Sequence, residues 1–175
     1  MPEAFRVANI GNGHLAVMAR PGVGEPIPKT FATLATLGVR VVVSLLEATE
    51  TRELGLEGEQ SACEAAGIEF FSFPIKDRGL PRDPEAVSRL SRLAHARIAG
   101  GCGWVFHCRA GIGRSGMMAA SVLLQEGLTV REAFARISAA RGLTVPDTPG
   151  QLEWLEEHSA IIAGKISVPD GPVSE

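Results

Sequence analysis

The segment from Val105 to Gly116, Val-Phe-His-Cys-Arg-Ala-Gly-Ile-Gly-Arg-Ser-Gly, constrains this chain more than any other feature. An apolar run typical of a strand ends at Cys108, five residues with two glycines follow, and a helix-forming stretch begins at Arg114. A short glycine-rich loop that leads from a strand into a helix aims several backbone N–H groups at one point, where the helix N-terminus adds partial positive charge. The segment therefore predicts an anion cradle within an α/β fold.

The residue types in this loop suit a phosphate ester, which is a tetrahedral dianion and needs several donors on one side. Arg114 supplies a planar fork that can bind two phosphate oxygens at once. The same donors favour the thiolate form of Cys108, and the thiolate is the nucleophilic form of the sulfur. The alternative is a buried structural cysteine beside a surface arginine, but the joint occurrence of strand, loop, arginine and helix argues against it.

These residues resemble the signature loop of the cysteine-dependent protein tyrosine phosphatase superfamily. The resemblance is closer to its small dual-specificity-like members, which include bacterial and cyclin-dependent kinase inhibitor 3-like phosphatases, and it extends from about Leu15 to His158. It implies hydrolysis of phosphate monoesters through a phosphocysteine on Cys108, without a cofactor or metal. The residues that would bind the substrate phosphate are Arg109, Ala110, Gly111, Ile112, Gly113 and Arg114.

The leaving oxygen of such a reaction needs a proton, which a carboxylic acid on a nearby loop can supply. The resemblance assigns this role to Asp77, because the segment around it is similar to the acid loop of the superfamily. Asp83 is the competing carboxylate, but a helix N-cap before Pro84 already explains it. Ser115 is expected to donate a hydrogen bond to the departing sulfur, or else to be an ordinary serine at a helix N-terminus.

Three further polar residues are candidates for supporting roles. Because neighbouring residues of a strand point to opposite faces, His107 is expected to be a buried histidine that orders the loop rather than a base for Cys108. Gln151 resembles a water-positioning glutamine of the superfamily, and a capping box with Thr148 explains it equally well. Glu47 could pair with an arginine of the site, or be a solvated loop glutamate.

The substrate is less well constrained than the chemistry. Arg109 adds positive charge at the loop rim, but Ile112 is apolar where relatives acting on phosphoinositides often carry more basic side chains. The chain has no tyrosine, so it lacks the tyrosine-bearing loop that walls a deep phosphotyrosine pocket in relatives, and a shallower pocket is expected. Phosphotyrosine, phosphoserine or phosphothreonine proteins are the predicted substrates, with a small phosphorylated molecule or an inositol phosphate as the alternative.

Other functions fit the motif less well. A rhodanese-like sulfurtransferase usually has a cysteine loop one residue shorter, and an arsenate reductase would need shuttle cysteines, whereas no cysteine follows Cys108. Low-molecular-weight phosphatases carry the loop near the N-terminus, with the acid after it. A pseudophosphatase that only binds phosphorylated partners typically lacks the cysteine, the arginine or the acid, and this chain has all three residues.

Composition limits the class of protein. With 175 residues, 45% of them hydrophobic, the chain can form one packed domain. A formal charge of −3 gives no reason to expect nucleic-acid binding, and neither a signal peptide nor a membrane span is evident. Cys63, Cys102 and Cys108 form an odd set, which argues against a disulfide scaffold and for the reducing cytoplasm. The protein is expected to be a monomer. Cys63 and Cys102 are expected to be core or strand-edge residues, with a disulfide to Cys108 left open.

Strand and helix patterns alternate along the chain, which predicts one α/β domain with a central, mostly parallel sheet and helices on both faces. Cys108 and the Asp77 loop each follow a strand. Because the carboxyl ends of parallel strands meet at one edge of the sheet, this pattern could bring the two together. The domain is predicted to span residues 1–164, and residues 165–175 to be a loose tail. The expected strands lie within Ile10–Met18, Val39–Leu46, Ile68–Phe73 and Gly103–His107, and the expected helices are Pro28–Leu37, Thr49–Ala66, Pro84–Ala99, Arg114–Glu126, Val130–Arg141 and Pro149–Ala163.

Overall fold

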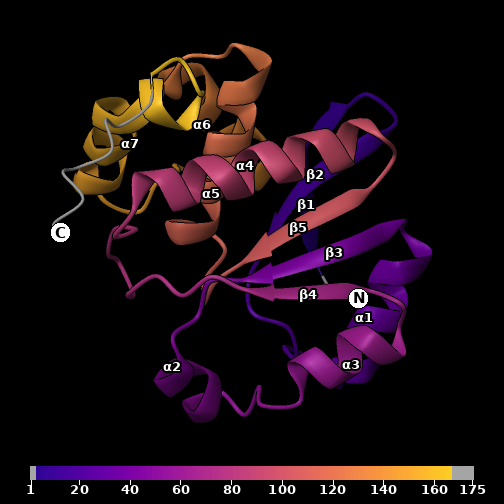
Figure 1. The fold of residues 1–175 in the computed structure, drawn as a ribbon. Coiled ribbons are helices and arrows are strands. Elements are labelled where there is room, and N and C mark those ends of the chain that lie inside the picture. The colour runs from indigo at the N-terminus through magenta and orange to yellow at the C-terminus, as the bar shows by residue number, and fades with distance from the viewer. Residues whose placement is uncertain (1–2, 167–175) are drawn as a thin grey trace, which may run out of the picture.

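Five strands form a single sheet in the order β1-β2-β5-β3-β4 in the computed structural model, which describes residues 3–166 (Figure 1). Strands β2, β5, β3 and β4 run parallel, and β1 pairs antiparallel with β2 at one edge. The predicted mostly parallel sheet is thus confirmed. The strands are β1 (Ala4–Ile10), β2 (Gly13–Met18), β3 (Val39–Ser44), β4 (Glu69–Ser72) and β5 (Gly103–His107).

The central strand β5 carries the site, and both of its faces are covered. All five of its residues are buried. Trp104 and Phe106 pack in one core layer and Val105 in the other, as the alternation of side chains along a strand requires. A strand buried on both faces reads as a continuous apolar run, which is why its position was predictable from the sequence.

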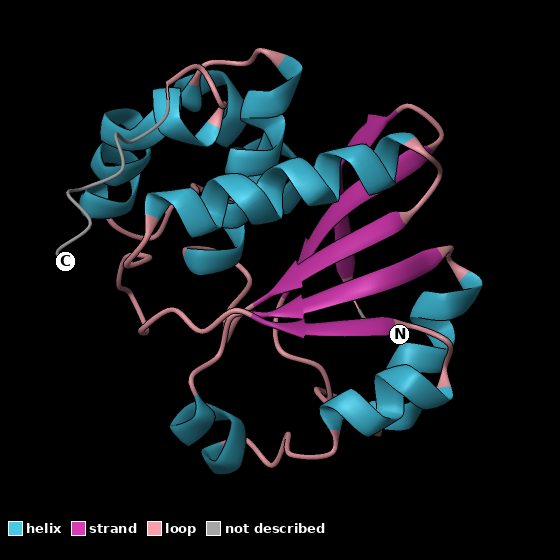
Figure 2. Cartoon of the chain, in the orientation of Figure 1, coloured by secondary structure: helices cyan, strands magenta, loops and turns pink. Residues whose placement is uncertain are grey.

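Helices cover both faces of the sheet, as predicted (Figure 2). On one face lie α1 (Ile27–Thr36) and α3 (Glu59–Ala65), and on the other lie α4 (Pro84–Ala99), α5 (Arg114–Leu123), α6 (Val130–Arg141) and α7 (Pro149–Ile162). A 3₁₀ turn, η1 (Leu124–Glu126), extends α5. The short helix α2 (Ala48–Glu53) lies beyond the carboxyl end of β3, apart from both layers (Figure 1).

The prediction of one helix from Thr49 to Ala66 is wrong. The chain forms two helices, α2 and α3, joined by residues 54–58, and Gly55 in this link adopts φ +66°. Glycine adopts this left-handed conformation without the strain that a Cβ would cause, so the helix ends there. The break lets Glu50 of α2 and Glu59 of α3 both reach the end of β5, which one straight helix could not do.

The helix starts were predicted correctly where the sequence carried a capping signal. Asp83 accepts a hydrogen bond from the Glu85 N–H at 2.9 Å, and capping boxes open α6 at Thr129 and α7 at Thr148. The antiparallel strand β1 was missed apart from its last residue. It is an edge strand with a register shift between Arg6 and Ala8, so its apolar alternation is interrupted. The predicted tail lies mostly in residues 167–175, outside the described residues.

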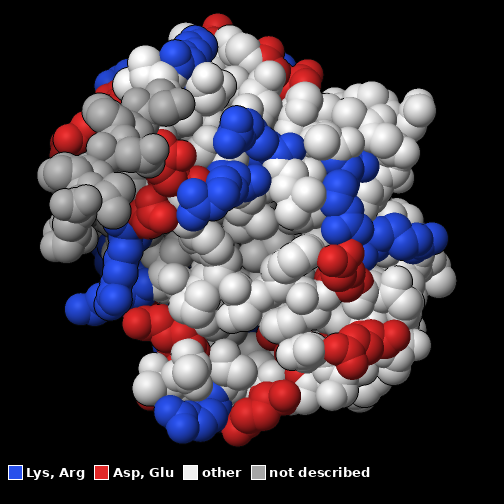
Figure 3. Space-filling model, viewed as in Figure 1, with Lys and Arg blue, Asp and Glu red and all other residues white. Residues whose placement is uncertain are grey.

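The surface and the helices of the described part add two observations. In the view of Figure 3, acidic and basic side chains are both present, and neither sign covers the visible face. No helix within residues 3–166 is long and apolar enough to cross a membrane.

Candidate active site

A cavity of about 280 Å³ lies at the carboxyl edge of the sheet, where β5 leads into α5. Its wall combines the loop after β5 with residues of the β4–α4 and α6–α7 connections. The lining residues are Asp77, Arg78, Cys108, Arg109, Ala110, Ile112, Gly113, Arg114, Asp147 and Gln151. A larger cavity of about 470 Å³ between α6 and α7 contains none of these residues. The predicted nucleophile, arginine and acid therefore line one pocket, although 37 residues separate Asp77 from Arg114.

Cys108 follows the last residue of β5 and is 3% exposed. Its Sγ lies 3.4 Å from Oγ of Ser115, within hydrogen-bond distance for sulfur. Ser115 is fully buried in the first turn of α5. The predicted proximity of the Ser115 hydroxyl to the sulfur is thus present, and the hydroxyl can donate to a sulfur that carries negative charge.

Arg114 is the first residue of α5 and is 2% exposed. Its guanidinium forms a bidentate ion pair with Glu50, with Nη1–Oε2 and Nη2–Oε1 distances of 2.7 and 3.0 Å. Nη1 also donates to the carbonyl oxygen of Ile75 at 2.9 Å, and Nη2 to Oδ1 of Asp77 at 3.0 Å. Arg114 thus joins α2, the Asp77 loop and the loop after β5.

Glu50 was not predicted as a site residue. The sequence analysis considered Glu47, which lies three residues earlier and whose backbone N–H instead donates to Oε2 of Glu50 at 3.0 Å. Burial would raise the pKa of Glu50, but the hydrogen bonds from Arg114 and from this N–H outweigh it, so the pKa lies below its ordinary value of 4.5. Burial would likewise lower the pKa of Arg114, but Glu50, Cys108 and Asp77 raise it overall. Both groups of the pair are therefore charged at neutral pH.

The loop after β5 is held from its outer side through its carbonyl groups. The Arg20 N–H donates to the Arg109 carbonyl at 3.3 Å, and Arg141 of α6 donates to the carbonyls of Gly111 and Ala110 at 2.9 and 3.2 Å. Because C=O and N–H point in opposite directions in a planar trans peptide, this arrangement turns the following N–H groups toward the pocket. An anion in the cavity would be met by successive backbone donors.

Contacts behind the loop explain why Gly111 has no side chain and how Arg141 is held in place. Gly111 has φ +71°, and a Cβ on it would lie 2.5 Å from the backbone carbon of Met18, so a side chain does not fit there. The Arg141 guanidinium is placed 4.0 Å above the ring of Phe5 in β1. Neither Arg141 nor Phe5 was predicted, because their link to the loop exists only after β1 and α6 pack together.

The structure separates the two candidate acids. Asp77 lies in a tight turn in which the Gly79 N–H donates to the Lys76 carbonyl at 2.8 Å, and its side chain is 51% exposed at the pocket while it contacts Arg114. Asp83 caps α4 and is not among the lining residues. Of the two candidate acids, only Asp77 lines the pocket together with Cys108.

His107 and Gln151 are both fully buried. Nε2 of His107 lies 2.5 Å from Oε1 of Glu59 in a buried pair, which fixes the ring beside the end of β5. The expectation of a buried histidine is confirmed, while its partner Glu59 was not predicted. Gln151 lines the pocket, and it completes the capping box with Thr148 and donates to the Gly79 carbonyl at 3.3 Å.

The other two cysteines lie away from the pocket. Cys63 is a buried residue of α3 and packs in the core layer opposite to that of Cys108, and burial, with Glu59 and Glu64 adding to it, raises the pKa of its thiol to about 12. Cys102 comes immediately before β5 and Cys108 immediately after it, and the strand alone spans about 13 Å from Gly103 to His107 at roughly 3.3 Å per residue. A disulfide allows less than about 7 Å between Cα atoms, so Cys102 cannot bridge to Cys108 in this fold.

The arrangement can carry out covalent transfer of a tetrahedral oxyanion. It offers a buried sulfur, backbone donors and an arginine around one anion position, and a carboxyl group at the rim that can exchange a proton. Within residues 3–166 no group of three or more His, Cys, Asp or Glu side chains could hold a metal ion.

Comparison with known proteins points to the same chemistry. The family model Tc-R-P, described as "Polymorphic toxin system, DSP-PTPase phosphatase", matches residues 16–128. This range covers more than half of the chain and includes the last three residues of β2, all of β3 to β5, the Asp77 turn and the whole loop from Cys108 to Arg114.

Solved structures with the same fold include three phosphatases. Kinase associated phosphatase (KAP), with serine in place of its catalytic cysteine, has a TM-score of 0.81 at 20% identity, covering 93% of this chain and 96% of its own. Tk-PTP in its active form has a TM-score of 0.74 at 26% identity, covering 94% and 99%. PTPMT1 in complex with PI(5)P has a TM-score of 0.75 at 24% identity, covering 93% and 97%.

The ion pair between Arg114 and Glu50 predicts a pH-dependent stability. Glu50→Gln leaves Arg114 buried with less compensation and should lower the free energy of unfolding at pH 7 by about 3 kcal/mol. Because the pKa of Glu50 is lowered by folding, its contribution is present above its ordinary pKa and is lost as the pH falls through the folded value. The difference between wild type and Glu50→Gln should therefore shrink toward acid pH.

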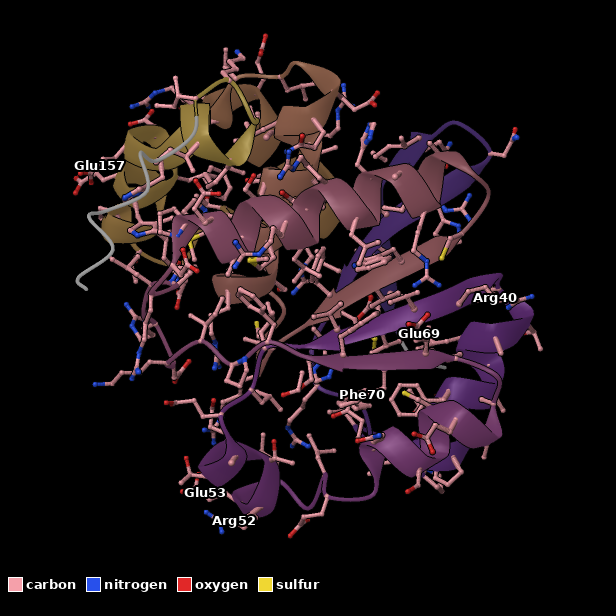
Figure 4. The ribbon with its side chains drawn as sticks, viewed as in Figure 1. Arg40, Arg52, Glu53, Glu69, Phe70 and Glu157 are labelled. Atoms are coloured by element: carbon pink, nitrogen blue, oxygen red, sulfur yellow. The ribbon has the colours of Figure 1, made fainter. Side chains whose placement is uncertain are left out.

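Urea denaturation at a series of pH values measures this difference. Glu53→Gln is the matched control, because Glu53 lies on the same helix and its side chain points away from the sheet (Figure 4). A difference between wild type and Glu50→Gln that stays constant from about pH 6 to about pH 3 would contradict the assignment.

Arg141 is predicted to matter for anion binding although it does not line the cavity. Arg141→Met keeps an aliphatic side chain against Phe5 but frees two loop carbonyls, so the N–H donors lose their alignment. We expect the affinity for vanadate, measured by calorimetry, to fall about tenfold, which is the loss of about one charge-assisted hydrogen bond. Arg136→Met, an exposed arginine of the same helix, should bind vanadate as the wild type does, and equal losses in both variants would refute the role of Arg141.

Proposed function

Since the chain belongs to the DSP-PTPase phosphatase family, we propose that Cys108 is the nucleophile with which it removes phosphate from its substrates. Membership makes the chain a cysteine-dependent phosphoric monoester hydrolase. The observation that carries the assignment is the convergence of Cys108, Arg114 and Asp77 on one 280 Å³ cavity. A pseudophosphatase that lacked one of these groups would have no such convergence.

In the first step, Sγ of Cys108 attacks phosphorus, the S–P bond forms and the bond from phosphorus to the leaving oxygen breaks. Asp77 gives its proton to that oxygen, so an alcohol or phenol departs. Arg114 and the loop N–H groups bind the three remaining oxygens throughout and stabilise the transferring group. The product of this step is a phosphocysteine.

In the second step, water attacks phosphorus, Asp77 accepts a proton from it and the S–P bond breaks. The Ser115 hydroxyl, 3.4 Å from Sγ, donates a hydrogen bond to the departing thiolate. Inorganic phosphate then leaves and Asp77 is protonated again. Gln151 lines the same cavity and can orient the water, besides capping α7.

The hydrogen bond between Asp77 and Arg114 belongs to the pocket as it is before phosphate binds. Nη2 of Arg114 spans 3.0 Å to Oδ1 of Asp77, while its other bonds go to Glu50 and Ile75. A bound phosphate dianion would compete for this nitrogen, so the carboxyl group of Asp77 would be released to face the leaving oxygen. Substrate binding itself thus prepares the acid for the first step.

The mixed charge of the cavity supports a substrate with one phosphate group, such as a phosphorylated side chain of a protein. The cavity is lined by two arginines at its rim, Arg78 and Arg109, but also by two carboxylates, Asp77 and Asp147. A polyphosphorylated inositol would bring further phosphates close to these carboxylates. The alternative of a lipid or inositol phosphate has support in the similarity to PTPMT1, whose solved complex contains PI(5)P.

A comparison of substrate classes tests this preference. Purified protein would be assayed with phosphotyrosine, phosphoserine and phosphothreonine peptides of one sequence, with inositol phosphates, and with PI(5)P in detergent. We expect the highest kcat/KM on a phosphopeptide. A higher kcat/KM on PI(5)P or on an inositol phosphate would overturn the protein-substrate proposal while leaving the chemistry intact.

Cys108→Ser is predicted to abolish turnover of an aryl phosphate but to keep affinity for inorganic phosphate within about threefold of wild type, because the N–H groups and Arg114 remain. The wild type should release one equivalent of the phenol in a rapid burst if breakdown of the phosphocysteine is slower than its formation. Turnover by Cys108→Ser at more than about a thousandth of the wild-type rate would exclude the thiolate as the nucleophile.

Asp77→Asn is predicted to slow hydrolysis according to the basicity of the leaving group. Phenyl phosphate needs the proton and should lose about 10²–10⁴-fold in kcat, whereas an activated aryl phosphate should lose much less. Asp83→Asn is the control, since asparagine also caps helices and Asp83 is not a lining residue. A loss in Asp77→Asn that is the same for every leaving group would show that Asp77 is not the acid.

A further inference from the structure

The segment from Asp147 to Gln151, at the start of α7, touches both loops that form the pocket. A Cβ on Gly113 of the loop after β5 would lie 2.9 Å from Cβ of Asp147 and 2.8 Å from Oε1 of Gln151, so this segment packs directly on that loop. On its other side, Gln151 Nε2 donates to the Gly79 carbonyl at 3.3 Å, and Oδ2 of Asp147 accepts from Arg78 Nη1 at 3.2 Å. The segment is therefore a bridge between the loop that carries Cys108 and the turn that carries Asp77.

The backbone at Arg78 is held in a conformation that its residue type disfavours. Arg78 has φ +53° and is the only residue other than glycine within 3–166 with a positive φ. A left-handed conformation costs roughly 1–2 kcal/mol for such a residue, so surrounding contacts must maintain it. The contacts available are the Lys76–Gly79 turn and the Arg78–Asp147 ion pair. Arg78 immediately follows Asp77, so whatever fixes Arg78 also fixes the peptide next to the proposed acid.

We propose that Arg78 and Asp147 are positioning residues whose ion pair across the pocket mouth holds Asp77 over Cys108 during catalysis. The proposal rests on the role of Asp77 as general acid. Before substrate binds, Asp77 is also held by Arg114 at 3.0 Å. A bound phosphate takes over that nitrogen, so the side chain of Asp77 loses this contact at the moment when its position matters. From then on the Arg78–Asp147 pair and the Gln151 contact with Gly79 hold the turn.

The exposure of the pair sets the size of the effect. The side chains of Arg78 and Asp147 are 64% and 36% exposed, and ion pairs in such surroundings contribute modestly because water and salt screen them. Loss of the pair should therefore slow the reaction by about three- to tenfold, far less than loss of Asp77 itself. The effect should also diminish at high salt.

The dependence on the leaving group separates positioning from general stabilisation. Arg78→Met and Asp147→Asn should each lower kcat about three- to tenfold for phenyl phosphate and less than about twofold for an activated aryl phosphate. The double variant should be no slower than either single variant, because both remove the same interaction. Arg82→Gln removes a charge from an exposed arginine of the same β4–α4 connection and should match wild type on both substrates.

Exchange of the two charges gives a rescue experiment. The double variant Arg78→Asp, Asp147→Arg restores an ion pair of opposite orientation and should recover part of the kcat on phenyl phosphate relative to Arg78→Asp alone. Additive losses in the Met/Asn double variant, or equal losses on both leaving groups, would overturn the proposal. Failure of the proposed function would instead appear as turnover by Cys108→Ser or as a leaving-group-independent Asp77→Asn, so the two failures are distinguishable.

Discussion

The buried ion pair between Arg114 and Glu50 is the interaction on which the rest of the site depends. A guanidinium that is 2% exposed needs a compensating charge, and Glu50 supplies it through two hydrogen bonds. The planar fork cannot rotate freely once Glu50 and the Ile75 carbonyl are bound, so Nη2 is directed toward Asp77 and the cavity. The same pair attaches α2 to the first turn of α5. The contact with Glu50 thus both compensates the charge of Arg114 and aligns its guanidinium for the proposed binding of phosphate.

The other parts of the pocket are aligned by groups behind it in a similar way. His107 is fixed by Glu59 at the end of β5, and the loop carbonyls are fixed by Arg141 and by the Arg20 N–H. None of these side chains needs to touch a substrate. Their effect is that the backbone donors and the sulfur are already oriented before an anion arrives, and preorganised donors of this kind account for much of the electrostatic stabilisation in enzymes.

The break between α2 and α3 shows how local backbone chemistry reaches the site. A single helix across residues 49–66 would satisfy the apolar pattern, and it was the expectation from the sequence. Gly55 ends α2 instead, and the two short helices direct Glu50 to Arg114 and Glu59 to His107. The position of Gly55 therefore decides which glutamates become partners of the site.

The sequence by itself determined the loop from Cys108 to Arg114, the sheet with helices on both faces and the N-cap role of Asp83, because each has a local signal: a strand–loop–helix motif, periodic apolar residues, or an N-cap before proline. The choice of Asp77 as the acid rests on the resemblance of its segment to the acid loop of the superfamily, and it stays a prediction. Only the tertiary structure decided the partners Glu50, Glu59 and Arg141 and the contact of Arg78 with Asp147. These residues are charged side chains without a distinguishing local pattern, and 30 to 69 residues separate them from the groups they bind. Their roles arise when packed helices bring distant charges to one edge of the sheet, where the buried charges of Glu50 and Glu59 need partners.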